Sequence, residues 1–124
     1  MARIASLVVV FAVLLLVSSP ASAGGEVRRS GSCSGGPGHW VLRVRRDDGA
    51  LRVRFKIDDV PAGQAWQIFL SNDGTRIFSG TRTSTASGEV RVSKRTPNRR
   101  GSDRIAASGV NTRTGTTCEG SLTY

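Results

Sequence analysis

The residues of this chain that could do acid–base or metal chemistry are few and scattered. His39 is the only histidine, and a general base needs an orienting acid and a nucleophile, which no motif around it supplies. Asp47-Asp48 and Asp58-Asp59 could each offer oxygens to Ca²⁺, but neither pair has the further acidic positions of a calcium loop. We therefore expect His39 at an edge or turn and both acidic pairs in turns. We expect no metal, no cofactor and a protein that is not an enzyme.

Positive charge is the chemical property that stands out. The chain has 18 Lys and Arg residues against nine Asp and Glu residues, for a formal net charge of +9. Some of these cations alternate with apolar residues, and others surround Pro97. An exposed surface of such residues would attract polyanions. The candidate polyanion-binding residues are Arg43, Arg45, Arg52, Arg54 and Lys56, and a secondary basic cluster consists of Lys94, Arg95, Arg99 and Arg100.

A solvated surface without a ligand is the alternative interpretation, because runs of charge are usually exposed faces. Specific nucleic-acid recognition is not expected. The exposed positions lack the interleaved aromatic residues on which bases of single strands stack.

The segment 1–23 has the pattern of an export signal. Arg3 precedes an apolar run, and Ala21-Ser22-Ala23 is a small-x-small cleavage site. The run is shorter than the roughly twenty residues of a membrane-spanning helix. We expect cleavage before Gly24 and a mature protein without a transmembrane segment. Its expected location is secreted or extracellular, either released or associated with the envelope.

The two cysteines allow one pairing, between Cys33 and Cys118. Export to an oxidising compartment makes a disulfide the expected state. The competing interpretations fit less well, because a redox pair usually has C-x-x-C spacing and two cysteines with one distant histidine make a poor zinc site.

Short alternating runs of apolar and polar residues begin at His39. This period of two predicts β-strands, whereas the Gly/Ser/Arg-rich segment 24–38 is expected to be a flexible lead-in. Regular turn signals favour a single all-β domain over 39–124, an antiparallel immunoglobulin-like or fibronectin-like sandwich with Trp66 in its core. The seven expected strands are 40–45, 51–58, 66–70, 75–83, 90–92, 105–110 and 118–124.

The first two runs should pair as a hairpin around the turn at 47–49. Apolar residues must face the core together. One register that achieves this sets Val44 opposite Val53 and Arg43 opposite Arg54, and a slip by two residues also keeps the faces correct. Either register makes the outer face cationic, although like charges directly opposite each other are mildly destabilising.

Four motifs combine cysteine, tryptophan and turn glycines: Cys33-Ser34-Gly35-Gly36 followed by Trp40, Gly63-Gln64-Ala65-Trp66, Phe78-Ser79-Gly80-Thr81-Arg82-Thr83, and Asn111-Thr112-Arg113-Thr114-Gly115-Thr116-Thr117-Cys118. They resemble motifs of small secreted actinobacterial proteins of unknown function that have an immunoglobulin-like or fibronectin-like sandwich and one disulfide. The resemblance implies the same fold, bond and export, and it supplies no activity or site residues.

Two functions are compatible with these features. The first is a secreted, non-enzymatic β-sandwich module that binds anionic envelope polymers through its cationic hairpin. The alternative is a small secreted inhibitor of an extracellular enzyme, of protease type, acting through the loop 112–117. Polyanion binding would weaken steeply with salt, and loop insertion far less. The partner is accordingly an anionic envelope polymer or an extracellular protein.

Overall fold

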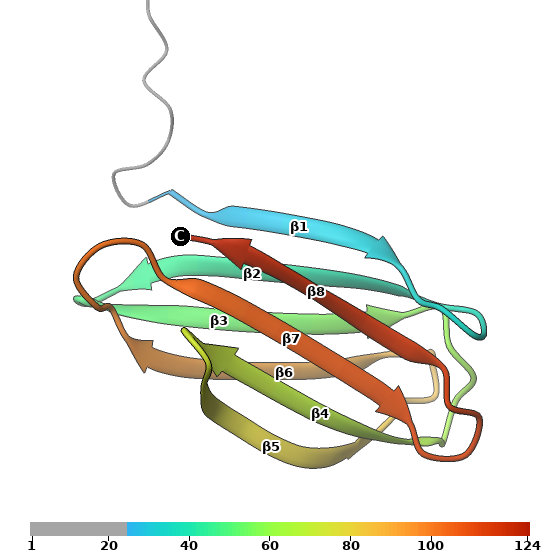
Figure 1. Ribbon diagram of the computed structural model, residues 1–124. Coiled ribbons are helices and arrows are strands. Elements are labelled where there is room, and N and C mark those ends of the chain that lie inside the picture. The colour runs from blue at the N-terminus through green and yellow to red at the C-terminus, as the bar shows by residue number, and fades with distance from the viewer. Residues whose placement is uncertain (1–24) are drawn as a thin grey trace, which may run out of the picture.

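The computed structural model describes residues 25–124, which form two stacked β-sheets (Figure 1). The expected signal peptide at 1–23 lies outside the described residues. Residues 25–124 contain no helix that is long and apolar enough to cross a membrane. The strands are β1 (Val27–Ser32), β2 (His39–Asp47), β3 (Ala50–Asp58), β4 (Ala65–Asn72), β5 (Thr75–Thr83), β6 (Val90–Pro97), β7 (Arg104–Asn111) and β8 (Thr117–Thr123).

The strand order is β1-β2-β3-β6 in the first sheet and β5-β4-β7-β8 in the second. All neighbouring strands are antiparallel. The chain passes from one sheet to the other after β3, after β5 and after β6, which produces the Greek-key connections of an immunoglobulin-like sandwich. The predicted all-β sandwich is therefore confirmed, with eight strands in place of about seven.

The additional strand, β1, lies in the segment that the sequence predicted to be a flexible lead-in. It pairs with β2, with Val27 opposite Val44 and Gly31 opposite Trp40. A Cβ atom on Gly31 would lie 2.9 Å from the Trp40 indole. The Trp40 ring therefore packs against β1 at Gly31, while Arg29 on the same side stays exposed, so β1 shows no apolar alternation of its own. That is why the sequence pattern does not reveal it.

The β2–β3 hairpin has the first of the two registers allowed by the sequence. Val44 lies opposite Val53 and Arg43 opposite Arg54. Asp48 and Gly49 occupy the turn with φ of 48° and 79°. Two left-handed residues in a two-residue loop match the right-handed twist of the strands, so the turn itself helps to exclude the slipped register.

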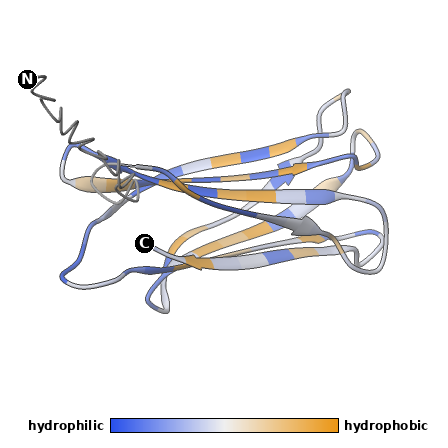
Figure 2. Ribbon diagram, turned by 90° about the horizontal axis from the view of Figure 1, so that it is seen from above, coloured by the Kyte–Doolittle hydropathy of each residue, from blue (hydrophilic) through white to orange (hydrophobic). Residues whose placement is uncertain are grey.

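The core lies between the two sheets. Figure 2 shows hydrophobic and hydrophilic residues alternating along several strands, as expected when one side of each sheet is buried. Trp66 on β4 and Phe55 on β3 are the largest of the fully buried side chains, at 0% and 2% exposure. The prediction of Trp66 as a core residue is thus confirmed.

The predicted disulfide between Cys33 and Cys118 is present, with the two Cα atoms 4.3 Å apart. It joins the β1–β2 connection of one sheet to β8 of the other. Beside it, Ser34 and Thr117 exchange backbone hydrogen bonds with N–O distances of 2.8 and 2.9 Å. At the opposite end of β1, the Tyr124 hydroxyl donates to the carbonyl of Gly25 at 3.2 Å. These contacts close one side of the sandwich.

Gly120 on β8 of the second sheet leaves room for the ring of Trp40 on β2 of the first sheet. A Cβ atom at position 120 would overlap that ring. Replacing Gly120 by alanine should lower the free energy of unfolding by about 1–3 kcal/mol, the usual effect of overpacking a core. Urea unfolding followed by tryptophan fluorescence would measure the loss. Ser121→Ala, on the outer side of the same strand, is the control and should change stability by less than about 0.5 kcal/mol. Equal stabilities of the two variants would contradict the close packing of Trp40.

Candidate anion-binding face

Eight cations project from the outer side of the first sheet, and we call this surface the cationic face. Side chains on a strand alternate between the two sides of a sheet, so residues between buried neighbours point outward. Arg28, Arg43 and Arg54 thereby lie in one row across β1, β2 and β3. The face consists of Arg28, Arg43, Arg45, Arg52, Arg54, Lys56, Arg91 and Arg95.

The other members extend this row in both directions along the strands. Arg45, Arg52 and Arg95 form a second row toward the β2–β3 turn. Lys56 lies opposite Arg91 on the side toward the disulfide. The face therefore has cations on all four strands of the first sheet.

Three carboxylates at the margins of this surface each have one cationic partner, whereas Asp48, in the β2–β3 turn, forms no ion pair. These ion pairs also hold the side chains of Arg52, Lys56 and Arg91 in place. The nitrogen–oxygen distances are 3.0 Å for Arg52 and Asp47, 3.4 Å for Lys56 and Asp58, and 3.1 Å for Arg91 and Glu89.

Five arginines of the face form no ion pair with the carboxylates of residues 25–124. One of them, Arg95, donates instead to the backbone carbonyls of Asp47 and Asp48 at 3.0 and 3.2 Å. The other four are Arg28, Arg43, Arg45 and Arg54. Arg43 is half-buried and the other three are exposed. Their charges remain available to an external anion, and they are adjacent, so their potentials add.

A depression of about 420 Å³ lies on this face. Arg43, Arg54, Lys56 and Arg91 provide charged side chains around it, and Val41 and Ser93 contribute to its lining. It therefore brings together two arginines without an ion pair and two cations that have carboxylate partners.

All five residues that the sequence predicts for polyanion binding lie on the cationic face. Sequence reasoning missed Arg28 and Arg91. Arg91 has a usable signal, because it stands between the apolar residues Val90 and Val92 and must point outward. Arg28 has none, because β1 itself is missed.

The predicted secondary basic cluster is not a single surface. Arg95 lies opposite Arg52 on the cationic face, whereas Lys94 is opposite the core residue Val53 and belongs to the other side of β6. Arg99 and Arg100 lie in the loop before β7, where the Arg99 backbone N–H donates to the buried Asp103 carboxylate at 3.3 Å. Strand alternation separates residues that are neighbours in sequence.

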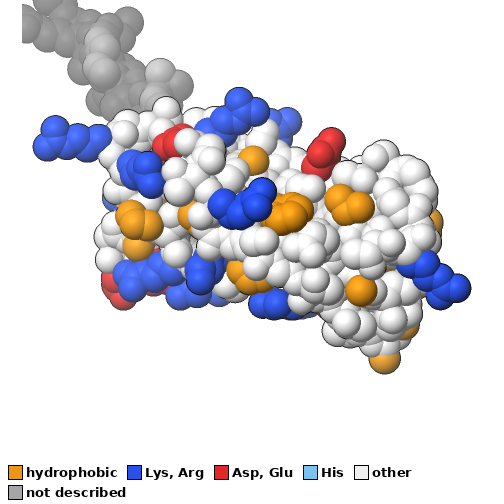
Figure 3. Space-filling model, turned by 60° about the horizontal axis from the view of Figure 1, so that its bottom comes forward, with side chains coloured by type: hydrophobic (Ala, Val, Ile, Leu, Met, Phe, Trp, Pro, Cys, Tyr) orange, Lys and Arg blue, Asp and Glu red, His pale blue; other side chains and the backbone are white. Residues whose placement is uncertain are grey.

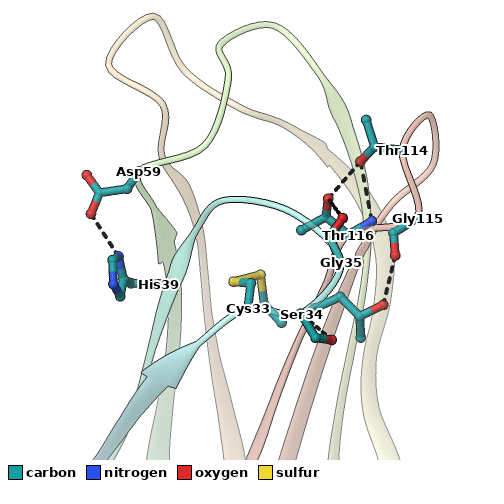
Figure 4. The surroundings of a disulfide bond; sticks show 10 residues. Cys33, Ser34, Gly35, His39, Asp59, Thr114, Gly115 and Thr116 are labelled. Carbon is teal, nitrogen blue, oxygen red and sulfur yellow. Dashed lines mark hydrogen bonds and ion pairs between the residues drawn. A yellow bond between two sulfur atoms is a disulfide. The ribbon is translucent and has the colours of Figure 1, made fainter.

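The pairing of β2 with β3 also brings together three candidate metal ligands, His39, Asp58 and Asp59. From the sequence, His39 was expected at an edge or turn and the two aspartates in a turn. His39 lies opposite Asp58, and its Nδ1 is 2.9 Å from Oδ2 of Asp59 (Figure 4). One ligand atom from each residue lies within 4.8 Å of the others. A metal would have to displace Lys56 from Asp58 and break the His39–Asp59 contact.

The loop 112–117, the candidate inhibitory loop, is a compact turn beside the disulfide (Figure 4). The side-chain oxygen of Asn111 accepts hydrogen bonds from the backbone N–H groups of Arg113 and Thr114 at 2.9 and 3.1 Å. The Gly115 N–H donates to the Asn111 carbonyl at 2.8 Å. The loop thus presents a closed turn and not the extended backbone that pairs with a sheet edge.

The outer side of the second sheet has a different character. Its depression of about 530 Å³ is lined mainly by small and polar residues, with Phe69 and one residue of each charge, Arg76 and Glu119. Figure 3 shows Lys and Arg side chains spread over the underside of the molecule, where Asp and Glu are sparse. Arg76, Arg82 and Arg104 of the second sheet also form no ion pair among the described residues, but none of them lies opposite another cation. Directly opposed cations are thus the feature that distinguishes the first sheet.

Comparison with models of known protein families and with curated protein sequences finds no match to this chain.

Proposed function

We propose that this protein is a secreted, non-enzymatic module that binds an anionic polymer of the cell envelope through the cationic face. The observation that carries the proposal is the row of Arg28, Arg43 and Arg54, three adjacent cations without an ion pair among the described residues. Like charges in directly opposed positions destabilise a sheet. An anionic ligand would offset that repulsion, and guanidinium groups bind phosphate oxygens in a bidentate manner.

The placement of the acids supports the same function. Asp47, Asp58 and Glu89 pair with cations at the margins of the face and leave its middle positive. A linear polymer lying across the four strands would follow the row of Arg28, Arg43 and Arg54. Phosphate-rich wall polymers offer the required repeated negative charge.

The test measures binding of the purified, oxidised protein to immobilised poly(glycerol phosphate) between 50 and 500 mM NaCl, concentrations chosen to span roughly one decade of ionic screening. A four-arginine variant replaces Arg28, Arg43, Arg45 and Arg54 by serine. The control variant replaces Arg76, Arg82, Arg104 and Arg113, exposed arginines of the second sheet and its loop, and loses the same charge.

Affinity of the native protein should fall steeply with salt, because binding releases counter-ions from the polymer. Removing four contacts should make the slope of log affinity against log salt shallower by about 3, if the coefficient for single-stranded nucleic acids applies. The control variant should keep a slope close to that of the native protein. Equal slopes for the two variants would contradict the proposal, and salt-independent binding would direct attention to the alternative inhibitory loop at 112–117.

A further inference from the structure

The geometry points to a terminal phosphomonoester of the anionic polymer as the group that occupies the depression on the cationic face. This inference rests on the proposed function of the same face. Arg43 lies directly opposite Arg54, and Lys56 lies directly opposite Arg91. Successive outward side chains on a strand are separated by about 6.6 Å, a distance that long cationic side chains span. The two opposed pairs therefore border one space, and all four residues line it.

The charge around this space matches a dianion. Lys56 and Arg91 keep Asp58 and Glu89 as partners, whereas Arg43 and Arg54 form no ion pair within residues 25–124. The excess is therefore close to two positive charges. A phosphomonoester carries about −1.5 to −2 at pH 7 and has three strong acceptor oxygens. A diester within the polymer has a single negative charge and two free oxygens, and it would leave part of the cationic lining without a partner.

The depression has room for the end of a chain. Val41 of β2 lies opposite Lys56 of β3. A longer side chain at position 41 would reduce the space in the depression. The volume of about 420 Å³ accommodates a phosphate group with part of the first polymer unit. Arg28, Arg45 and Arg52 lie outside the depression on the same face and can bind the diesters that follow.

The experiment compares two poly(glycerol phosphate) samples, one with a terminal phosphomonoester and one from which a phosphatase has removed it. The native protein should bind the first about tenfold more tightly than the second. A depression variant, Lys56→Ser with Arg91→Ser, should bind both samples equally. The control, Arg28→Ser with Arg45→Ser, loses the same charge from the same face and should bind both more weakly while keeping the tenfold preference. Thermal unfolding of each variant verifies that it is folded.

The pH dependence of this preference gives a second readout. The second ionisation of a phosphomonoester has a pKa of about 6, so the preference should rise by up to about tenfold between pH 5 and pH 7.5. The charged groups of the protein around the depression are Arg43, Arg54, Lys56 with Asp58, Arg91 with Glu89, and His39 opposite Asp58. They face both polymer samples, so the ratio of the two affinities isolates the ionisation of the terminal phosphate.

Equal binding of the two samples by the native protein would overturn the inference and leave the proposed function intact. A preference that persists in the depression variant would also overturn it, because the end group would then bind elsewhere. Failure of the native protein to bind the dephosphorylated polymer even at low salt would instead count against the proposed function.

Discussion

Replacing Cys33 and Cys118 by serine should lower the free energy of unfolding by about 4.5 kcal/mol. The chain-entropy model relates the effect to the length of the closed loop, and here the two cysteines are separated by 85 positions. The unfolded chain without the bond gains far more conformations than the folded sandwich does. Urea unfolding of both proteins, followed by circular dichroism, would measure the difference and would show whether the m-value also changes.

Reduction of the native protein provides the control for this double substitution. Reduced native protein should unfold at nearly the same urea concentration as the serine variant, since both lack the covalent link. A loss below about 1 kcal/mol would contradict the estimate and would indicate that the unfolded chain keeps β1 and β8 close without the bond.

Truncation of Trp66 to alanine should have the second largest effect, a loss of about 3–5 kcal/mol. Trp66 is fully buried on β4, between the sheets, and its removal would leave a large cavity. Its indole N–H has no hydrogen-bond partner in the structure. Trp66→Phe, which eliminates that buried N–H and keeps most of the ring, should therefore destabilise much less than Trp66→Ala.

Phe69→Ala offers the matched control, because Phe69 is on the same strand and points outward. It is half-buried, under the Arg76 guanidinium at 4.2 Å from the ring centre. Its truncation should cost clearly less than that of Trp66. Comparable losses in urea unfolding for the two alanine variants would show that Trp66 does not dominate the core of this sandwich.

The hairpin was the most predictable part of the fold, although the alternation of apolar residues left two registers open. In β3 every second residue from Leu51 to Ile57 is apolar, and a single face must enter the core. β1 was unpredictable for the opposite reason. On its inner side only Val27 packs against the core and Gly31 lies against Trp40 of the neighbouring strand, so its sequence carries one valine and otherwise polar or small residues.

The candidate site was predictable to the extent that strands were recognised. Alternation places Arg43 and Arg54 on one face without any structural information. Alternation also places Lys94 and Arg95 on opposite sides of β6. Grouping the two residues into one basic cluster because they are neighbours in sequence overlooks this. Contacts between residues far apart in sequence, such as the approach of His39 to Asp59, depend on strand pairing and turn geometry and leave no local pattern.

The position of the disulfide determines when in the life of the chain it can form. Its second cysteine is on β8, the last strand of the sandwich, while the first follows β1. At roughly 5–20 residues per second of synthesis, the thiol of Cys33 exists for several seconds before its partner does. Oxidation is therefore a late event in maturation that requires the whole domain. Cross-links between incomplete chains through Cys33 are the characteristic defect to expect when oxidation comes too early.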